Sequence, residues 1–140
     1  MRPLRACSLV LVVLLIGGSA AGCQSPTPPA QAPQQYDRLV KTALAQARAR
    51  GDTSLFWLRN TGPAAARSLM LDLGVDYLRY DRAADVLCVW TGEGLWPARG
   101  YVTAPAAGTA PTEGVGRRCN IEGTCTVATA APPWGRFECR

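Results

Sequence analysis

The residues best suited to chemistry in this chain are its cysteines. Six cysteines occur among 140 residues, and there is no histidine. A thiol can bind a metal, take part in redox chemistry or form a disulfide, whereas imidazole is the usual general base, proton shuttle and zinc ligand. The absence of histidine argues against hydrolytic and metal chemistry. We therefore expect that the chain is not an enzyme and uses no cofactor.

Two of the cysteines lie in an N-terminal segment with the three-part layout of a secretion signal. Arg2 and Arg5 precede an apolar stretch at residues 9–16, and small residues at 17–22 lead directly to Cys23. The apolar stretch is well short of the roughly 20 residues that a membrane-spanning helix needs. We expect residues 1–22, which include Cys7, to be cleaved off after export.

The sequence Ala20-Ala21-Gly22-Cys23 resembles the lipobox of bacterial lipoprotein precursors, although leucine is commoner at the position of Ala20. That resemblance implies a diacylglyceryl group on the Cys23 thiol, a fatty acid on the new amino group and a membrane anchor. By the enterobacterial sorting rule, Gln24 implies an outer-membrane lipoprotein that faces the periplasm, whereas a Gram-positive host has one membrane only. The alternative is ordinary cleavage and secretion.

The four remaining cysteines indicate disulfides. They are Cys88, Cys119, Cys125 and Cys139. An even set in an exported domain predicts two bridges, and the spacing contains no C-x-x-C pair that would favour a metal site or redox catalysis. Residues 120–123 suit a type I turn followed by a left-handed glycine, which would place Cys119 across a hairpin from Cys125. We predict the pairs Cys119–Cys125 and Cys88–Cys139.

The charges are scattered. Loss of Arg2 and Arg5 lowers the formal net charge from +5 to +3, and the longest basic run is Arg117-Arg118. Nucleic-acid-binding domains concentrate Lys and Arg on one face or in one run. We therefore expect no nucleic-acid partner.

A proline-rich segment separates Cys23 from the rest of the chain. Residues 24–34 contain four prolines and no large apolar side chain, so they favour neither a helix nor a core. As polyproline II, this segment would hold the domain up to roughly 35 Å from the bilayer. We interpret residues 23–34 as the lipidated cysteine with its tether, and residues 35–140 as one periplasmic domain.

Two helices are predicted from the spacing of apolar residues. Positions i, i+3, i+4 and i+7 are apolar from Tyr36 to Ala47, and Gly51 can supply a left-handed cap. A second helix starts at Pro63, carries a buried stripe and stops at Gly74.

The remaining elements are predicted to be strands and loops. The strands cover residues 53–59, 75–80, 86–91 and 101–103. The first is apolar on both faces, which is typical of a central strand. Residues 81–85 form a turn, and residues 104–116 form a long loop. The order of elements predicts a small α+β domain with two helices and an antiparallel sheet, stabilised by disulfides.

Aromatic residues beside the Pro- and Gly-rich segments are candidates for a partner-binding patch. The candidates are Trp96, Arg99, Tyr101 and Trp134, with Phe137 beside them and Arg117 and Arg118 at the rim. The alternative is that these aromatic side chains cap a thin core. Trp57 and Trp90 lie in strand patterns and are interpreted as core residues.

Two classes of function remain open at this point. The first is a membrane-anchored envelope lipoprotein that acts as an accessory or binding module through contacts with an envelope protein. The second is a small periplasmic inhibitor or ligand-binding protein. In that case residues 92–100 or the Cys119–Cys125 hairpin would enter another molecule's cleft.

Overall fold

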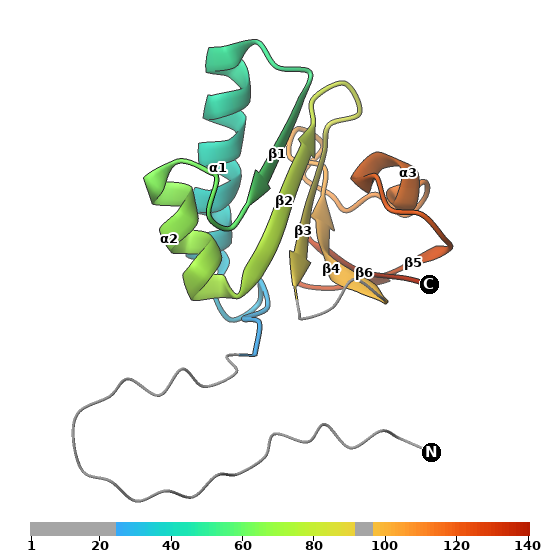
Figure 1. Ribbon diagram of the computed structural model, residues 1–140. Coiled ribbons are helices and arrows are strands. Elements are labelled where there is room, and N and C mark those ends of the chain that lie inside the picture. The colour runs from blue at the N-terminus through green and yellow to red at the C-terminus, as the bar shows by residue number, and fades with distance from the viewer. Residues whose placement is uncertain (1–24, 92–96) are drawn as a thin grey trace, which may run out of the picture.

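Two amphipathic helices form where the apolar spacing predicts them. In the computed structural model, which describes residues 25–91 and 97–140, α1 spans Pro33–Arg50 and α2 spans Ala64–Leu73 (Figure 1). Gly51 and Gly74 end the two helices with φ of 66° and 69°, a conformation that glycine adopts without steric cost. Both predicted helix ends are confirmed. The start of α1 lies three residues before Tyr36, because proline is well tolerated in the first turn of a helix.

Among the residues described, six strands form one antiparallel sheet in the order β1-β2-β3-β4-β6-β5. The strands are β1 (Ser54–Leu58), β2 (Val75–Asp81), β3 (Val86–Thr91), β4 (Ala98–Thr103), β5 (Cys125–Thr129) and β6 (Gly135–Cys139). The predicted hairpin of β2 and β3 is confirmed, and the Asp81 carboxylate accepts the backbone N–H groups of Ala83 and Ala84 in its turn. The fold class is α+β, as the order of elements predicts.

The first strand is an edge strand, so the prediction that it is central is wrong. Of the described strands, β1 pairs with β2 alone, and its residues alternate between exposed and buried. Leu55 and Trp57 point into the core, while Phe56 and Leu58 point to the other face. β1 is therefore apolar on both sides because Leu55 and Trp57 enter the core while Phe56 and Leu58 form an exposed apolar surface.

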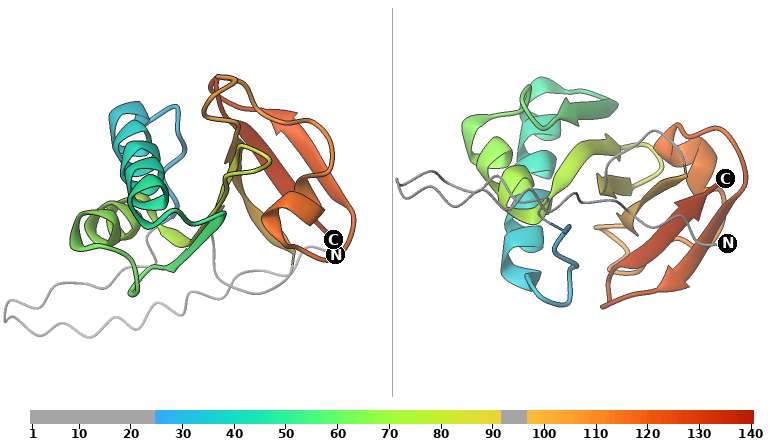
Figure 2. Two further views of the ribbon diagram at one scale, coloured as in Figure 1. Left: turned by 90° about the horizontal axis from the view of Figure 1, so that it is seen from above. Right: turned by 60° about the horizontal axis from the view of Figure 1, so that its bottom comes forward.

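The two faces of the sheet carry separate apolar cores. Helices α1 and α2 cover one face, and α3 (Val115–Cys119) lies over the other (Figure 2). Tyr36 and Leu39 of α1 pack with Leu78 and Val89 of the sheet on the first face. On the second face the core is smaller and includes both disulfides.

Helix α3 lies where the sequence predicts a loop followed by a hairpin. Cys119 is its last residue, and Asn120 ends the helix with φ of 57°. Cys119 therefore has no place on a strand opposite Cys125. The part of the chain that the structure describes therefore contains a short third helix in addition to the two that are predicted.

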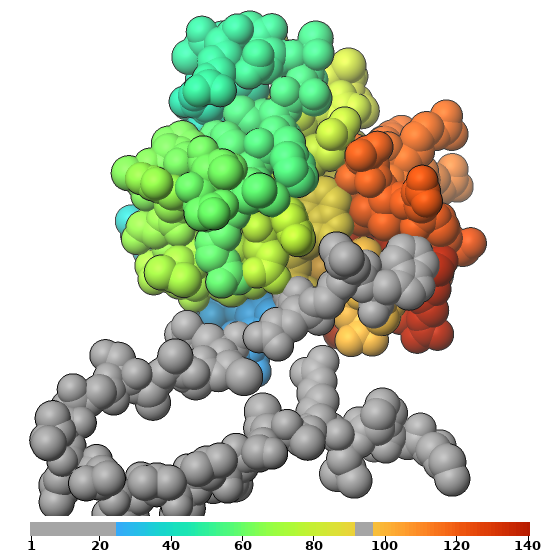
Figure 3. Space-filling model, in the orientation of Figure 1, coloured from blue at the N-terminus to red at the C-terminus, as the bar shows by residue number. Residues whose placement is uncertain are grey.

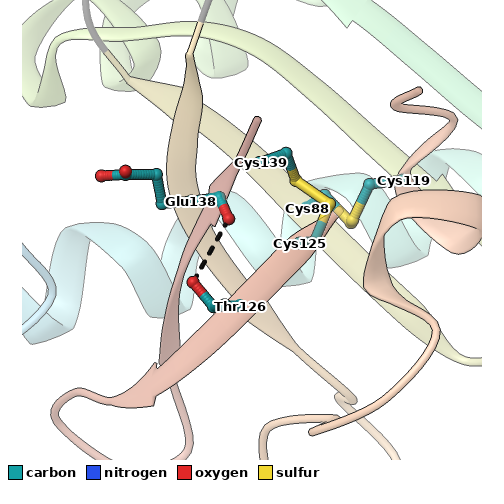
Figure 4. The surroundings of a disulfide bond; sticks show 6 residues. All are labelled: Cys88, Cys119, Cys125, Thr126, Glu138 and Cys139. Atoms are coloured by element: carbon teal, nitrogen blue, oxygen red, sulfur yellow. Dashed lines mark hydrogen bonds between the residues drawn. A yellow bond between two sulfur atoms is a disulfide. The ribbon is translucent and has the colours of Figure 1, made fainter. Parts of the chain in front are cut away.

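The prediction of two disulfides is confirmed, but the predicted pairing is wrong. Cys88 is bonded to Cys119 with a Cα–Cα distance of 5.9 Å, and Cys125 is bonded to Cys139 with a Cα–Cα distance of 4.0 Å (Figure 4). The physical reason is the sheet topology: β5 pairs with β6, and this register sets Cys125 directly opposite Cys139. Cys88 then faces the end of α3.

Residues 25–32, which we call the N-terminal arm, lie against the domain, in contrast to the free tether that the sequence predicts. Pro29 and Ala32 are buried, and α1 follows directly (blue segment in Figure 1). Proline excludes a helix here, but it does not exclude packing of an extended chain onto an apolar surface. Cys23 and Gln24 lie outside the described residues.

Candidate binding face

The sheet face opposite α1 and α2 is covered only in part. α3 packs over β3 and the adjoining part of β2, and the β1 end of this face is left exposed. Phe56 is 54% exposed and Leu58 is 36% exposed, which is unusual for large apolar side chains of a small sheet. In Figure 3 the yellow and ochre surface of β2 and β3 is visible between the green β1–α2 part and the orange α3 part.

The strand register shows which side chains share this face. Residues directly opposite each other on neighbouring strands point to the same side of a sheet. In one row across β1, β2 and β3, Phe56 is opposite Arg79, and Arg79 is opposite Cys88, which faces α3. In the neighbouring row on the same face, Leu58 is opposite Tyr77, and Tyr77 is opposite Trp90. We call the following five residues the open face. They are Phe56, Leu58, Tyr77, Arg79 and Trp90.

A row of aromatic rings crosses the open face from solvent to core. The centroids of Phe56 and Tyr77 are 6.2 Å apart with an interplanar angle of 15°, and Tyr77 meets Trp90 edge to face at 6.2 Å. Trp90 in turn meets the fully buried Phe137 edge to face at 6.1 Å. Such pairs contribute about 0.5–1.5 kcal/mol each beyond the area they bury. The row is therefore held rigidly at its inner end and presents Phe56 at its outer end.

Arg79 adds a positive charge next to this row. Its Nε atom is buried and has no hydrogen-bond partner among the described residues, and its guanidinium makes no ion pair there. By contrast, Arg59 is paired with Asp76. Burial of an unsatisfied polar atom costs about 1–3 kcal/mol, and more when the group is charged. A partner cannot reach the buried Nε atom, but its carboxylate would pair with the two terminal nitrogens of the half-buried Arg79 side chain.

The outer edge of β1 has backbone groups that pair with no other described strand. In an antiparallel pair, alternate residues direct both backbone groups toward the partner strand. The carbonyl of Thr53 accepts a hydrogen bond from the N–H of Arg82, the residue after β2, at 2.9 Å. The N–H of Arg59 donates to the carbonyl of Asp76 in β2 at 3.0 Å. The odd-numbered residues therefore face β2, and Ser54 and Phe56 direct their N–H and C=O groups away from the sheet.

A turn closes the outer edge of β1 at its Leu58 end. The N–H of Leu58 donates to Thr61 Oγ1 at 2.9 Å, and the carbonyl of Leu58 accepts from the N–H of Thr61 at 3.0 Å. An added strand could therefore pair with β1 only alongside Ser54 and Phe56.

The structure places the predicted patch residues differently. Trp134 is only 7% exposed and packs edge to face on Tyr36, with centroids 5.1 Å apart; Tyr101 contacts the same ring at 6.0 Å. Burial raises the pKa of Tyr36 well above its usual range, with a further contribution from Tyr101, and burial also raises the pKa of Tyr101. Trp134 therefore belongs to the core, as the alternative interpretation predicts, and the proposed surface role is wrong for this residue.

Arg99 is half-buried, and its Nε atom donates to Glu138 Oε2 at 2.9 Å. A hydrogen bond from Arg140, followed by that from Arg99, lowers the pKa of the Glu138 carboxyl, so Glu138 stays ionised and keeps both arginines occupied. Trp96 lies outside the described residues. Of the three described residues, Tyr101 and Trp134 are therefore engaged with Tyr36, and Arg99 is engaged with Glu138.

Sequence reasoning missed the open face, although one signal pointed to it. Phe56 and Leu58 make β1 apolar on its second side, and this was consistent with either a central strand or an exposed binding strand. Trp90, expected in the core, is half-buried at the inner end of the open face. Tyr77 and Arg79 carry no local signal, because only the register of β1, β2 and β3 brings them together.

Comparison of the chain with protein-family models, with curated proteins and with solved structures found no match. Over the residues described, no helix combines the length and the apolar character needed to cross a membrane.

Proposed function

We propose that this chain is a bacterial envelope lipoprotein, anchored through Cys23, whose domain is a binding module that contacts an envelope protein through the open face. The observation that carries the proposal is the exposed end of the aromatic row at Phe56, next to the guanidinium of Arg79, which makes no ion pair with any described residue. Tyr, Trp and Arg are the residues that dominate binding energy at protein interfaces. Two disulfides suit an oxidising compartment outside the cytoplasm.

The partner is an extended protein segment that adds to the outer edge of β1. The outward backbone groups of Ser54 and Phe56 would pair with its backbone, as in other cases of strand addition. Its side chains on the open-face side would include an apolar residue against Phe56 and a carboxylate for Arg79. A neutral or basic segment would leave the guanidinium without a partner.

The alternative is a small periplasmic inhibitor or ligand-binding protein, and fewer observations favour it. Of the two loops that it offered, the Cys119–Cys125 hairpin is replaced by α3 and a different pairing of the cysteines, and residues 92–96 of the other lie outside the described residues. A groove of about 450 Å³ lies between α1 and α2, but it is lined mainly by polar residues such as Arg38, Lys41 and Asp72. The open face has the stronger combination of apolar surface and unsatisfied polar groups.

A photo-crosslinking probe placed at Phe56 in living cells tests the binding proposal. We expect one discrete crosslinked protein, and the crosslinked peptide should combine apolar and acidic residues. Ser54→Pro removes the outward N–H without breaking a bond to β2, and Arg79→Gln removes the charge. Each change should reduce capture at least about tenfold, equivalent to about 1.4 kcal/mol.

The matched control is a probe at Leu71, which is 57% exposed on α2 and lies on the other side of the domain. It should not capture the same protein. Equal capture from Leu71, or capture from Phe56 that is unchanged by Ser54→Pro and Arg79→Gln, would contradict the proposal. Circular dichroism of both variants would show that the fold is retained.

The anchoring part of the proposal has its own test. Cys23→Ala should abolish metabolic labelling with a fatty acid and should move the protein from the membrane fraction to the soluble fraction, because several acyl chains are needed for stable attachment. Labelling that persists in the Cys23→Ala variant would show that the lipid is attached elsewhere.

A further inference from the structure

The N-terminal arm is fastened to the domain at its first residues. The N–H of Thr27 donates to the carbonyl of Leu73 at 3.0 Å, and the Tyr36 hydroxyl donates to the carbonyl of Thr27 at 2.8 Å. Because burial raises the pKa of Tyr36, this hydroxyl keeps its proton and remains a donor. Pro26 lies against Gly74, where an added Cβ would be 3.0 Å from the Pro26 Cα atom.

The remainder of the arm continues this attachment into α1. The N–H of Gln31 donates to the carbonyl of Pro28 at 3.0 Å and closes a turn, and Pro29 and Ala32 are buried on either side of it. The arm is therefore attached from residue 26 to the start of α1. The arm holds the chain at the end of the domain where α2 passes into β2, which we call the α2–β2 end.

The length of chain between the arm and the lipid is short. Pro26 is three positions after Cys23, with only Gln24 and Ser25 between them. A fully extended chain covers at most about 3.6 Å per residue step, or roughly 10 Å in total. This is well below the roughly 35 Å that a free proline-rich tether of eleven residues would reach.

We propose that the arm holds the α2–β2 end of the domain directly against the lipid surface, which makes this end a membrane-contacting surface. This inference rests on the proposed anchoring at Cys23. Leu58 and Tyr77 lie toward the same end of the sheet, because Val75 begins β2 there and Leu58 is opposite Tyr77. A partner that contacts this part of the open face must itself reach the membrane surface.

Short-range quenching by nitroxide-labelled lipid headgroups tests this orientation. The protein is purified from bacterial membranes with a fluorescent non-natural amino acid at the exposed Asp72, near the arm, or at the exposed Ala83, in the turn at the far end of β2. The two ends of β2 are about 20 Å apart. In phosphatidylethanolamine and phosphatidylglycerol vesicles, we expect the label at 72 to lose most of its fluorescence and the label at 83 to lose little.

The control inserts ten Gly and Ser residues between Gln24 and Ser25, which adds a flexible coil of about 17 Å. The insertion should abolish the difference between the two labels. With Cys23 shown to be acylated, equal quenching at 72 and 83 in the unmodified protein would overturn the inference while leaving the anchoring intact. Absence of acylation would overturn both.

Discussion

The double variant Cys88→Ala and Cys119→Ala is expected to lower the free energy of unfolding by about 4 kcal/mol. The bond closes a loop with a sequence separation of 31, and its loss restores that conformational freedom to the unfolded chain. It also releases α3, whose five residues are too few to form a stable helix without tertiary contacts. Chemical denaturation of the oxidised protein measures the effect. Alanine is used because both positions are buried and serine would leave an unsatisfied hydroxyl.

The second disulfide provides the matched control. Cys125→Ala with Cys139→Ala opens a loop with a sequence separation of only 14, which corresponds to about 3 kcal/mol. The strands that carry these residues also remain hydrogen-bonded to each other. A larger loss of unfolding free energy from the Cys125 and Cys139 variant than from the Cys88 and Cys119 variant would contradict this assignment of effects. A disulfide-linked Cys119–Cys125 peptide in non-reducing peptide mapping would contradict the pairing itself.

The second large effect is expected at Gly100 in β4, where Gly100→Ala should destabilise the domain by about 3 kcal/mol. A Cβ atom there would overlap the backbone carbonyl oxygen of Val89 and would lie 3.0 Å from Phe137 Cζ. The carbonyl belongs to a central strand and cannot move without disturbing the pairing of β3 with β4. Gly100 also lies between Trp90 and Phe137 in the register, so its missing side chain allows these rings to meet.

Gly108→Ala is the control for this change, because it makes the same chemical substitution in open space. A Cβ atom at Gly108 would meet no atom within 4 Å, so only its positive φ of 67° opposes the change. That strain is worth about 1–2 kcal/mol. We expect thermal unfolding to show a clearly smaller loss at Gly108 than at Gly100. Comparable losses of stability would contradict the account, because Gly100 has no positive φ and its substitution would then cost no more than the strain at Gly108.

The elements with strong local signals were predictable from the sequence. The helix ends at Gly51 and Gly74 follow from the need for a left-handed residue after the last turn, and the β2–β3 turn follows from the side-chain acceptor of Asp81. Helix α3 was not predicted, because the apolar periodicity of five residues is too short to distinguish a helix from a loop.

The candidate site depended on contacts between distant segments. An edge strand and a central strand can have the same apolar pattern, and only the position of β1 in the sheet distinguishes them. Arg79 and Tyr77 became part of the open face because β2 lies between β1 and β3. No pattern within any one strand contains that information.

The sequence by itself determined the α+β class, the positions of the two long helices and the presence of two disulfides, since each depends on residue types and on spacing along the chain. The tertiary structure alone decided which cysteines are bonded, which face of the sheet is left open and where the N-terminal arm lies. These features depend on strand order and on α3, which bring together residues far apart in the chain.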